Sequence, residues 1–520
     1  MNQNEDARLL AGVGTIETQQ PAEDGLKERV GGYRGKPRLK AVLRDQLLMR
    51  VLDVEKLIEA DHPARGIWEI VGRLDMSGFE KQIKAIEGQP GQSRIDPRVL
   101  TALWIYGNSQ GVGSARELSR MCEYEPGCQW LTGMEPVNYH TLADFRVDNK
   151  IALDELFVQV LGLLSAEGLI ELKQVTQDGT KIRANAGTDT FRREERLRQQ
   201  LELARQQVEQ LSDPHCEELS QRVAKARQRA IREKRQRLEL ALEELKKLQE
   251  NKQSSEKEYT RVSLTDPEAR QMKQSDGGFA PSYNVQVSTD VAHGIVVALG
   301  VTQAGNDMDQ LITGVKQVQQ NLGSQPAQLI TDAGYVSDGN VEAIEERGIE
   351  LIAPVPEKNP EASLRKRGVS REFYPDAFDY DAATNSYRCP AGKRLKLRQS
   401  RKYPGRIEHN YRARPADCRA CPFQDQCCGK SRVRLIVRSE PSPKVAAFRR
   451  RMDTVEAQQI YRKRAEVAEF VNAWLKDKIG LRQFHVRGRI KVLSEVLWAI
   501  LTYNIQQWMR LCWKAQLHSI

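Results

Sequence analysis

Two stretches of sequence, VTQDGTKIRAN at 175–185 and AQLITDAGYVSDG at 327–339, decide how this chain is expected to fold. Each runs from an apolar, β-branched segment into one aspartate, Asp178 or Asp332, with a glycine within the next two residues. A carboxylate at the end of a buried strand is costly without a partner, and two such ends side by side bring like charges together. A hard divalent cation between them removes that cost, so both aspartates are natural metal ligands. Taken singly, each aspartate followed closely by a glycine also fits a common turn.

The sequence around these aspartates predicts a mixed α/β sheet. Strands rich in Val, Ile and Thr are expected at 169–180, 283–290, 294–303, 327–335 and 349–355. The first three suit an antiparallel meander, and the last two, with a helix between them, add parallel strands. Helices are expected to close this domain at 455–510.

The region before the sheet predicts an all-α N-terminal domain over 41–167, preceded by a mobile basic arm over 1–40. Asp96-Pro97 and Ser114 supply helix starts. Two short helices around a glycine turn suit a helix-turn-helix that binds DNA, and an ordinary helical bundle fits the same pattern equally well.

A helical hairpin is expected within 191–250, inserted between the first two strands. Apolar residues recur at spacings of four and three from Leu197 to Leu211, are interrupted by SDPHC at 212–216, and resume from Val223 to Leu245. We interpret this segment as a coiled-coil spacer without catalytic residues. Its many Arg and Lys residues would also suit contact between protomers or with DNA.

A third acid comes from the predicted helix YRKRAEVAEFVNAWLKDKIG at 461–480. Glu469 shares a face with Lys476 and Arg462, each seven residues or about two turns away, whereas Glu466 points elsewhere. Alone, the segment fits a solvated charged helix. Together with two strand aspartates, the glutamate describes a two-metal phosphoryl-transfer site, in which one ion activates water or a DNA 3′-hydroxyl and the other stabilises the leaving oxygen.

The charge distribution favours a polyanionic partner. The chain has 520 residues with 80 Lys+Arg against 70 Asp+Glu, a net charge of +10. Residues 27–50 hold eight basic residues against two acids, and residues 393–414 hold nine against one. A solvated loop fits each patch as well, but two patches in a chain with a phosphoryl-transfer constellation favour phosphate contacts.

Nothing in the sequence suggests export or membrane insertion. The first twenty residues have no apolar run, and the apolar stretch 492–509 carries Ser494, Glu495 and Asn504, so it is expected to be a buried helix and no membrane partner is expected. Nine cysteines in 520 residues do not suggest a disulfide scaffold. A reducing, cytoplasmic compartment is therefore expected.

Five cysteines crowd into a small cysteine-rich insertion predicted at 386–432. Cys389, Cys418, Cys421 and Cys427 have the spacing of a tetrahedral thiolate Zn²⁺ site, with Cys428 adjacent and His409 as an alternative ligand. Metal support makes physical sense in a loop-rich segment with little core of its own. Redox-sensitive or merely free thiols are the alternative.

In order along about 41–510, this chain resembles DDE transposases of bacterial insertion sequences. The resemblance is carried by the apolar segment 99–107 and by HTLADFR (140–146), QDGTKIRANAG (177–187), PSYNVQVSTD (281–290), TDAGY (331–335) and YRKRAEVAEFVNAWLK (461–476). It implies a ribonuclease-H-like catalytic core, here built from 168–190, 260–385 and 440–510, with 511–520 as a C-terminal tail. The chain departs from the family in lacking a Phe-Gly pair near Asn472 and Ala473.

The resemblance also implies roles for individual residues. Asp178, Asp332 and Glu469 match the acidic triad that holds two ions, Mg²⁺ or Mn²⁺. The residues predicted to contact DNA are Tyr461, Arg464 and Lys476 of the glutamate helix, with Arg462, Lys181 and Arg183.

The expected function is DNA transposition. Such an enzyme cleaves double-stranded DNA at the terminal inverted repeats of its own element and joins the 3′-hydroxyl ends to target DNA, near the bacterial nucleoid. Bringing two ends together implies a homodimer. The alternatives are a metal-dependent nuclease of the same core without strand transfer, and a catalytically inactive, sequence-specific DNA-binding protein.

Overall fold

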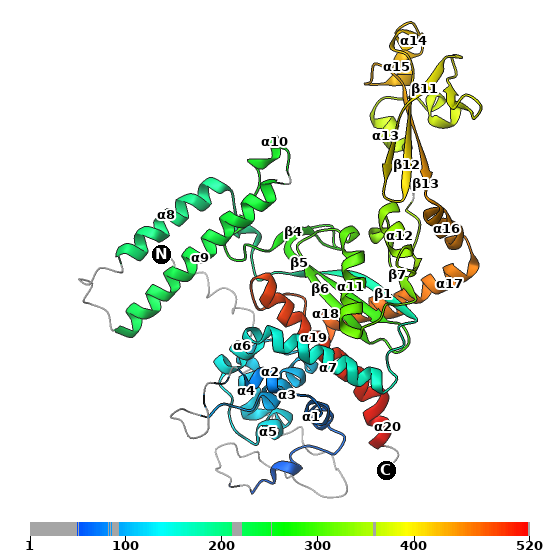
Figure 1. Ribbon diagram of the computed structural model, residues 1–520. Coiled ribbons are helices and arrows are strands. Elements are labelled where there is room, and N and C mark those ends of the chain that lie inside the picture. Colours follow the sequence, from blue (N-terminus) through cyan, green and yellow to red (C-terminus); the bar gives the residue numbers. More distant parts are fainter. Residues whose placement is uncertain are drawn as a thin grey trace, which may run out of the picture. The chain divides into compact units, whose positions relative to one another are not determined.

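The computed structural model describes residues 49, 51–81, 83, 85, 93–210, 221–250, 252–356 and 360–517. The basic arm predicted at 1–40 and the hairpin turn predicted at 212–216 lie outside these residues. From Asp53 onward the chain forms one compact unit, a mixed α/β structure with a helical N-terminal region (Figure 1).

The N-terminal region is helical, as predicted. Asp96 accepts a hydrogen bond from the Arg98 amide at 2.7 Å ahead of Pro97, and the Ser114 hydroxyl accepts one from the Glu117 amide at 3.4 Å, so both predicted helix starts are confirmed. The main helices are α1 (Pro63–Gly72), α2 (Ser77–Glu80), α3 (Pro97–Ser109), α4 (Ala115–Tyr124), α5 (Pro126–Thr132), α6 (Tyr139–Asp148) and α7 (Lys150–Ala166).

The predicted mixed sheet is present. Its strand order is β4-β5-β1-β7-β8, and β6 pairs with β5 further along the same edge as β4, opposite β1. The strands β1, β5 and β6 form the predicted antiparallel meander, and β7 and β8 are parallel to β1. The strands are β1 (Gln174–Arg183), β4 (Arg270–Lys273), β5 (Phe279–Asp290), β6 (Val296–Thr302), β7 (Gln328–Ile330) and β8 (Glu350–Ile352).

One boundary in this sheet corrects the sequence analysis. The first strand was predicted at 169–180, ending near Asp178, but β1 continues to Arg183. Asp178 and Gly179 therefore lie inside a strand that pairs with β5 throughout, and the interpretation of this Asp-Gly pair as a turn is wrong. Asp332 does lie at the end of a strand, as predicted, because β7 ends at Ile330 and the aspartate follows two residues later.

Helices cover the sheet and join it to the N-terminal region. α11 (Leu311–Leu322) and α12 (Asp338–Glu345) follow β6 and β7. The C-terminal helices are α16 (Pro443–Met452), α17 (Val455–Arg464), a π-helical turn over Ala465–Glu469, α18 (Phe470–Asp477), α19 (Arg489–Trp508), a second π turn over Met509–Trp513 and α20 (Lys514–Leu517).

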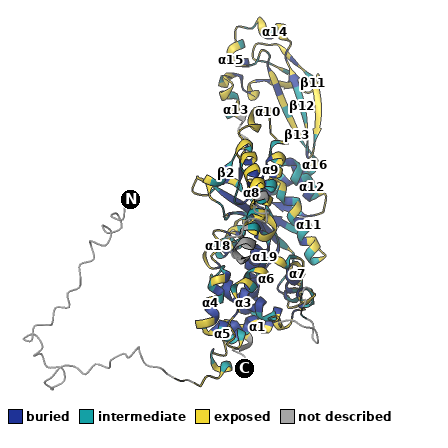
Figure 2. Ribbon diagram, turned by 90° about the vertical axis from the view of Figure 1, so that its left-hand side faces the viewer, coloured by how far each residue is buried: buried dark blue, intermediate teal, exposed yellow. Residues whose placement is uncertain are grey.

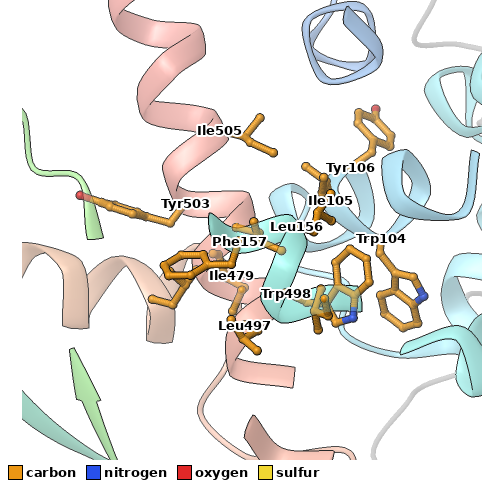
Figure 3. Close-up of a cluster of buried hydrophobic side chains, with 14 of the residues drawn as sticks. Trp104, Ile105, Tyr106, Leu156, Phe157, Ile479, Leu497, Trp498, Tyr503 and Ile505 are labelled. Carbon is orange, nitrogen blue, oxygen red and sulfur yellow. The ribbon is translucent and has the colours of Figure 1, made fainter. Parts of the chain in front are cut away.

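A single hydrophobic core runs from the N-terminal helices to α19 and the sheet. Figure 3 shows its centre, where Trp104 from α3, Phe157 from α7 and Trp498 from α19 lie together. The buried indole N–H groups of Trp104 and Trp498 donate to the carbonyl oxygens of Leu142 and Arg146 at 3.1 and 3.2 Å, so these large rings are buried without losing a hydrogen bond.

This core includes the start of the segment predicted to be a C-terminal tail. Trp513 is only 4% exposed, and a Cβ added to Gly66 on α1 would lie 2.9 Å from its ring. Residues up to 517 are helical. The absence of a side chain at Gly66 therefore lets the chain end pack against α1.

The predicted helical hairpin is present as α8 (Glu194–Gln210) and α9 (Gln221–Glu250), which pack on each other. Its small core contains the predicted Leu197, Leu201 and Ala204 from α8, with Leu238 and Leu245 from α9. The helices are otherwise largely exposed, as the yellow and teal ribbon in Figure 2 shows.

A second sheet, which the sequence analysis did not predict, carries the cysteine-rich segment. Its strand order is β13-β12-β11-β10-β9, and all neighbours are antiparallel. The elements are β9 (Asp379–Asp381), β10 (Ser386–Arg388), β11 (Arg394–Tyr403), β12 (Arg406–Arg412) and β13 (Leu435–Pro441), with α13 (Pro360–Lys366), α14 (Pro415–Arg419) and α15 (Gln424–Cys428). Within the described residues, no helix is long and apolar enough to cross a membrane.

Candidate active site

Asp178 and Asp332 occupy matching positions on neighbouring parallel strands. In the β1–β7 ladder Thr176 pairs with Ile330, and each aspartate comes two residues later in the chain, Asp178 within β1 and Asp332 just after the end of β7. Side chains two residues apart along extended chain point the same way. The two carboxylates therefore meet at one end of the β1–β7 pair, although 154 residues separate them in the sequence.

Side chains from α17 and α18 close over Asp178. Arg464 Nη2 donates to Asp178 Oδ1 at 2.9 Å, and Asn472 Nδ2 donates to Asp178 Oδ2 at 2.9 Å. The ion pair is largely buried, with 11% of the Arg464 side chain and 14% of the Asp178 side chain exposed. Both carboxylate oxygens of Asp178 are thus oriented by the helical segment that was predicted to carry the third acid.

The electrostatics of this pair depend on burial and on Asp332. Burial raises the pKa of Asp178; Arg464 opposes the rise, and the neighbouring Asp332 carboxylate adds to it. Burial by itself would lower the pKa of Arg464, but Asp178, Asp332 and Tyr461 outweigh it and the pKa is raised. The two aspartates and the guanidinium therefore form one interacting group, in which Arg464 offsets part of the negative charge of both acids.

Asp332 is held by the turn that follows β7. Its Oδ1 accepts a hydrogen bond from the Gly334 amide at 2.8 Å, which starts a short helical turn over Ala333–Tyr335. Tyr335 is fully buried beneath the site, and its hydroxyl donates to Gln286 Oε1 at 2.5 Å. Burial raises the pKa of this phenol, and the carboxylates of Asp307, Asp178 and Asp332 raise it further.

Glu469, the predicted third acid, lies on the π-helical turn that packs against β1 and β5. Its side chain is exposed, and in the described part of the chain no hydrogen bond or ion pair joins it to Asp178 or Asp332. A π turn has an i→i+5 repeat, so it brings Glu469 to the same side of the helix as Arg464. Glu466 is exposed as well. The structure thus brings two of the three acids together and leaves the third on the adjoining helix.

The residues predicted to contact DNA divide into two groups. Tyr461 and Lys476 are half-buried and act electrostatically on Arg464 and Asp178 respectively. Burial, with a smaller contribution from Arg482, lowers the pKa of Lys476. Arg462 is exposed, and no contact with the two aspartates is recorded for it in the described chain.

A basic groove begins beside Asp178. It has a volume of about 640 Å³ and contains the predicted Lys181 and Arg183. The Lys181 ammonium donates to the Lys273 carbonyl oxygen at 3.0 Å, and this hydrogen bond joins β1 to β4 along the wall of the groove. The charged residues lining the groove are Lys181, Arg183, Lys273, Lys476 and Arg482, against Asp276 and Asp307. The groove therefore presents a surplus of positive charge next to the acidic pair.

Sequence reasoning missed two polar residues at this site. Asn472 was noted only as a departure from the family pattern, yet it binds Asp178, and its own Oδ1 is buried without a hydrogen-bond partner. Asp307, at the start of α11, accepts hydrogen bonds on Oδ1 from Asn284 Nδ2 at 2.7 Å and Gln286 Nε2 at 2.6 Å.

Gly179 explains how Asp307 comes so close to β1. A Cβ added to Gly179 would lie only 2.4 Å from Asp307 Oδ1 and 2.5 Å from Gln286 Nε2. Glycine inside a strand marks a close approach of another group, and that was the available signal in the sequence. A third carboxylate thus reaches the strand next to Asp178, on the face opposite to Arg464.

The predicted cysteines lie together around one cavity, and their binding of a metal ion stays a prediction. Cys389, Cys418, Cys421, Cys427 and Cys428 line one small cavity, and the Lys393 amide donates to Cys389 Sγ at 3.2 Å. Burial, with the neighbouring thiols of Cys427 and Cys418, raises the pKa of Cys428 to about 12. His409 instead lies on β12, where it contacts Ser400 and Glu440. Among the described residues, no group of three or more His, Cys, Asp or Glu side chains is arranged to hold a metal ion.

Comparison with known proteins relates two parts of the chain to transposases. Residues 388–509 match the family described as Transposase DDE domain, and residues 52–148 match the family described as Transposase domain (DUF772). The first match contains Tyr461, Arg464, Glu469 and Lys476, whereas Asp178 and Asp332 lie outside both. No curated protein and no solved structure matches the chain.

These two matches confirm the resemblance to insertion-sequence DDE transposases. Members of that family act on DNA and generally use divalent metal ions. Two segments of the chain thus match transposase families, and its acidic pair lies in the part of the sequence between them.

Proposed function

We propose that the protein is a DNA transposase that cleaves the ends of its own insertion element and transfers the 3′-hydroxyl ends to target DNA. The observation that supports this most strongly is the position of Asp178 and Asp332, which follow the paired residues Thr176 and Ile330 of two parallel strands by two residues each. The helical segment that bears Glu469 packs against the same strand. The strand order β6-β5-β1-β7-β8 supports the interpretation of this sheet as a ribonuclease-H-like core.

The donor groups at the site fit Mg²⁺ or Mn²⁺. Such ions are usually held by one or two carboxylates and complete their coordination with water and phosphate oxygens. Each oxygen of Asp178 has two lone pairs, so it accepts from Arg464 or Asn472 and still has one pair for a cation. Asp178, Asp332 and Glu469 would hold two ions. When bound, these ions would supply an activated oxygen nucleophile and stabilise the leaving oxygen.

The remaining residues of the site position the reacting groups. Arg464 and Asn472 orient the two oxygens of Asp178 and offset part of the repulsion between the aspartates. Lys476, Lys181 and Arg183 in the basic groove would bind the phosphates beside the scissile bond. Asp307 reaches β1 through the space left by Gly179, on the opposite face of the strand, so it would add negative charge near the centre without supplying a metal ligand.

Two accessory features complete the proposal. Two element ends must be cut together, which requires two active centres and so a homodimer, acting on DNA in the bacterial cytoplasm. In the cysteine-rich segment we propose a structural Zn²⁺ held by Cys389, Cys418, Cys421 and Cys427. The convergence of these thiols on one cavity supports this assignment.

Cleavage of end-labelled DNA tests the proposal. The substrate is a duplex bearing the inverted repeat that flanks the coding region, incubated with the full chain and Mg²⁺. Asp178→Asn, Asp332→Asn and Glu469→Gln should each abolish nicking. Glu466→Gln is the matched control on the same helix and should nick like the unmodified protein.

Two further results separate the alternatives. Transfer of the labelled end into a supercoiled plasmid supports a transposase, whereas cleavage without transfer indicates a nuclease of the same core. Binding of the repeat without Mg²⁺-dependent nicking at any protein concentration would leave only a DNA-binding protein and refute the proposal.

A further inference from the structure

The second sheet has one strongly basic, exposed face that the active site does not use. On β10, β11 and β12 this face carries six exposed cations, which we call the basic face: Arg388, Arg394, Lys396, Arg398, Arg401 and Arg412. In the described part of the chain none of the six has a recorded ion pair with a carboxylate. Unpaired surface cations in such number point to an anionic partner.

The pairing of the strands places some of these cations opposite one another. Arg394 lies directly opposite Arg388 on β10, and Lys396 lies directly opposite Arg412 on β12. Like charges directly opposite each other destabilise an antiparallel pair. The sheet therefore carries two repulsive cation pairs that an external anion would relieve.

The acids near the basic face do not cancel its positive charge. On the edge strand β9, Asp379 lies directly opposite Arg388, and Asp381, which accepts a hydrogen bond from Thr384, also interacts electrostatically with Arg394. Glu408 faces Arg401 across the ladder, and its carboxylate accepts from Arg406 at 2.8 Å. Three acids thus stand against six cations and Arg406, which leaves a clear positive surplus centred on β11.

The length of the basic face fits duplex DNA. From Arg394 to Arg401 the strand advances seven residues, about 23 Å at ~3.3 Å per residue. B-DNA rises ~3.4 Å per base pair along each strand, so the row spans about seven base pairs of phosphates. A row of cations of this length along one strand matches the repeating charge of a duplex better than it matches a single small anion.

The base of this sheet is fixed beside the acidic pair. Gly405, in the turn between β11 and β12, has a φ of +78°, and a Cβ there would lie 2.1 Å from the Asp338 carbonyl, so the turn packs directly on α12. Arg406 Nη1 and Arg449 Nη2 bind the Asp338 carboxylate at 3.3 and 2.9 Å. Since α12 begins six residues after Asp332, the basic face starts next to the active centre.

From these observations we infer that the basic face binds duplex DNA adjacent to the cleavage site, over about seven base pairs. This inference rests on the proposed function, because it assigns the basic face to the same DNA molecule that enters the active site. The contacts are to phosphates, so they would position the duplex without reading its sequence.

Charge removal on the basic face tests this inference. The triple variant Arg394→Gln/Lys396→Gln/Arg412→Gln is compared with the full chain for binding a fluorescein-labelled 40-base-pair duplex of mixed sequence across 50–300 mM salt. Each lost phosphate contact reduces the slope of log K against log salt by ~0.9, so the slope should fall by about three. Affinity should weaken at least tenfold at low salt.

The matched control removes the same charge elsewhere in the same segment. Arg365, Lys366 and Lys430 are exposed but lie off the sheet, and Arg365→Gln/Lys366→Gln/Lys430→Gln should change neither affinity nor slope. Unchanged far-UV circular dichroism in both variants establishes that each is folded. If the basic-face variant keeps the affinity and slope of the unmodified chain, or if the control loses as much, the inference is wrong.

Failure of this inference is distinguishable from failure of the proposed function. Asp178→Asn should keep the salt slope while losing cleavage, because it removes a metal ligand and no phosphate contact. A basic-face variant that binds normally while the unmodified chain still cleaves refutes only the inference. Tighter binding to an RNA duplex of equal length would overturn the assignment of DNA as the partner.

Discussion

Replacing Gly179 by alanine should destabilise the sheet at the candidate active site. The new Cβ would lie 2.4 Å from Asp307 Oδ1 and 2.5 Å from Gln286 Nε2, closer than side chains pack in folded proteins. Neither neighbour moves freely, because Asp307 Oδ1 accepts hydrogen bonds at 2.6 and 2.7 Å from Gln286 and Asn284. Overpacking of this kind costs ~1–3 kcal/mol. Losing one of the hydrogen bonds adds about 1 kcal/mol, and the better strand propensity of alanine returns ~0.5–1 kcal/mol.

The expected net loss is therefore about 1–3.5 kcal/mol, localised around β1 and β5. Hydrogen–deuterium exchange of peptides covering 174–183 and 279–290 measures it directly, with the thermal midpoint as a second readout. Gly300→Ala is the matched control, because Gly300 faces Gln286 from the other side on β6 and has no atom within 4 Å of an added Cβ. If Gly179→Ala exchanges as slowly as Gly300→Ala, the inferred close packing of Asp307 on β1 is wrong.

Three further outcomes follow from the described contacts. Arg464→Met should lower the free energy of unfolding by ~2–4 kcal/mol in chemical denaturation and abolish nicking, because it leaves Asp178 buried without its cation. A variant as stable as the unmodified protein would contradict the ion pair. Asp266 is fully buried and accepts a hydrogen bond from the Tyr283 hydroxyl at 2.8 Å. Burial raises its pKa above the ordinary 3.8, so its protonated form is favoured in the folded chain and the free energy of unfolding should fall as pH rises from about 4 through the raised value. Asp266→Asn should flatten that slope, and an unchanged slope would count against this explanation. Elemental analysis should find about one zinc per chain, lost in Cys418→Ser but retained in Cys122→Ser; a zinc-free unmodified protein refutes that site.

Much of the central sheet could be predicted because its strands are rich in β-branched residues and flanked by turn signals. The meeting of Asp178 and Asp332 was predicted from the cost of two charged strand ends, whereas the strand order was not, because it depends on pairing between residues far apart in the sequence, such as Thr176 and Ile330. The error at the end of β1 has a simple cause. Asp-Gly is a common turn, and nothing local distinguishes a turn glycine from one that admits Asp307 from 128 residues away.

The second sheet was missed because its strands do not alternate between apolar and polar residues. In β11, only Leu395 and Leu397 mark an inner face, and the surrounding Arg and Lys residues suggest a solvated loop. Asn472 could not be recognised either, since its role depends on a contact with Asp178, 294 residues away. Residues that act through packing between distant elements carry little local signal.

The most direct test of the central claim is the position of bound Mn²⁺, located by anomalous diffraction from crystals of the protein with element-end DNA. The account predicts density between Asp178 and Asp332, with metal–oxygen distances of ~2.0–2.3 Å and with Glu469 as the next carboxylate. Manganese bound elsewhere, or no manganese near these two aspartates in a DNA-bound crystal, would contradict it.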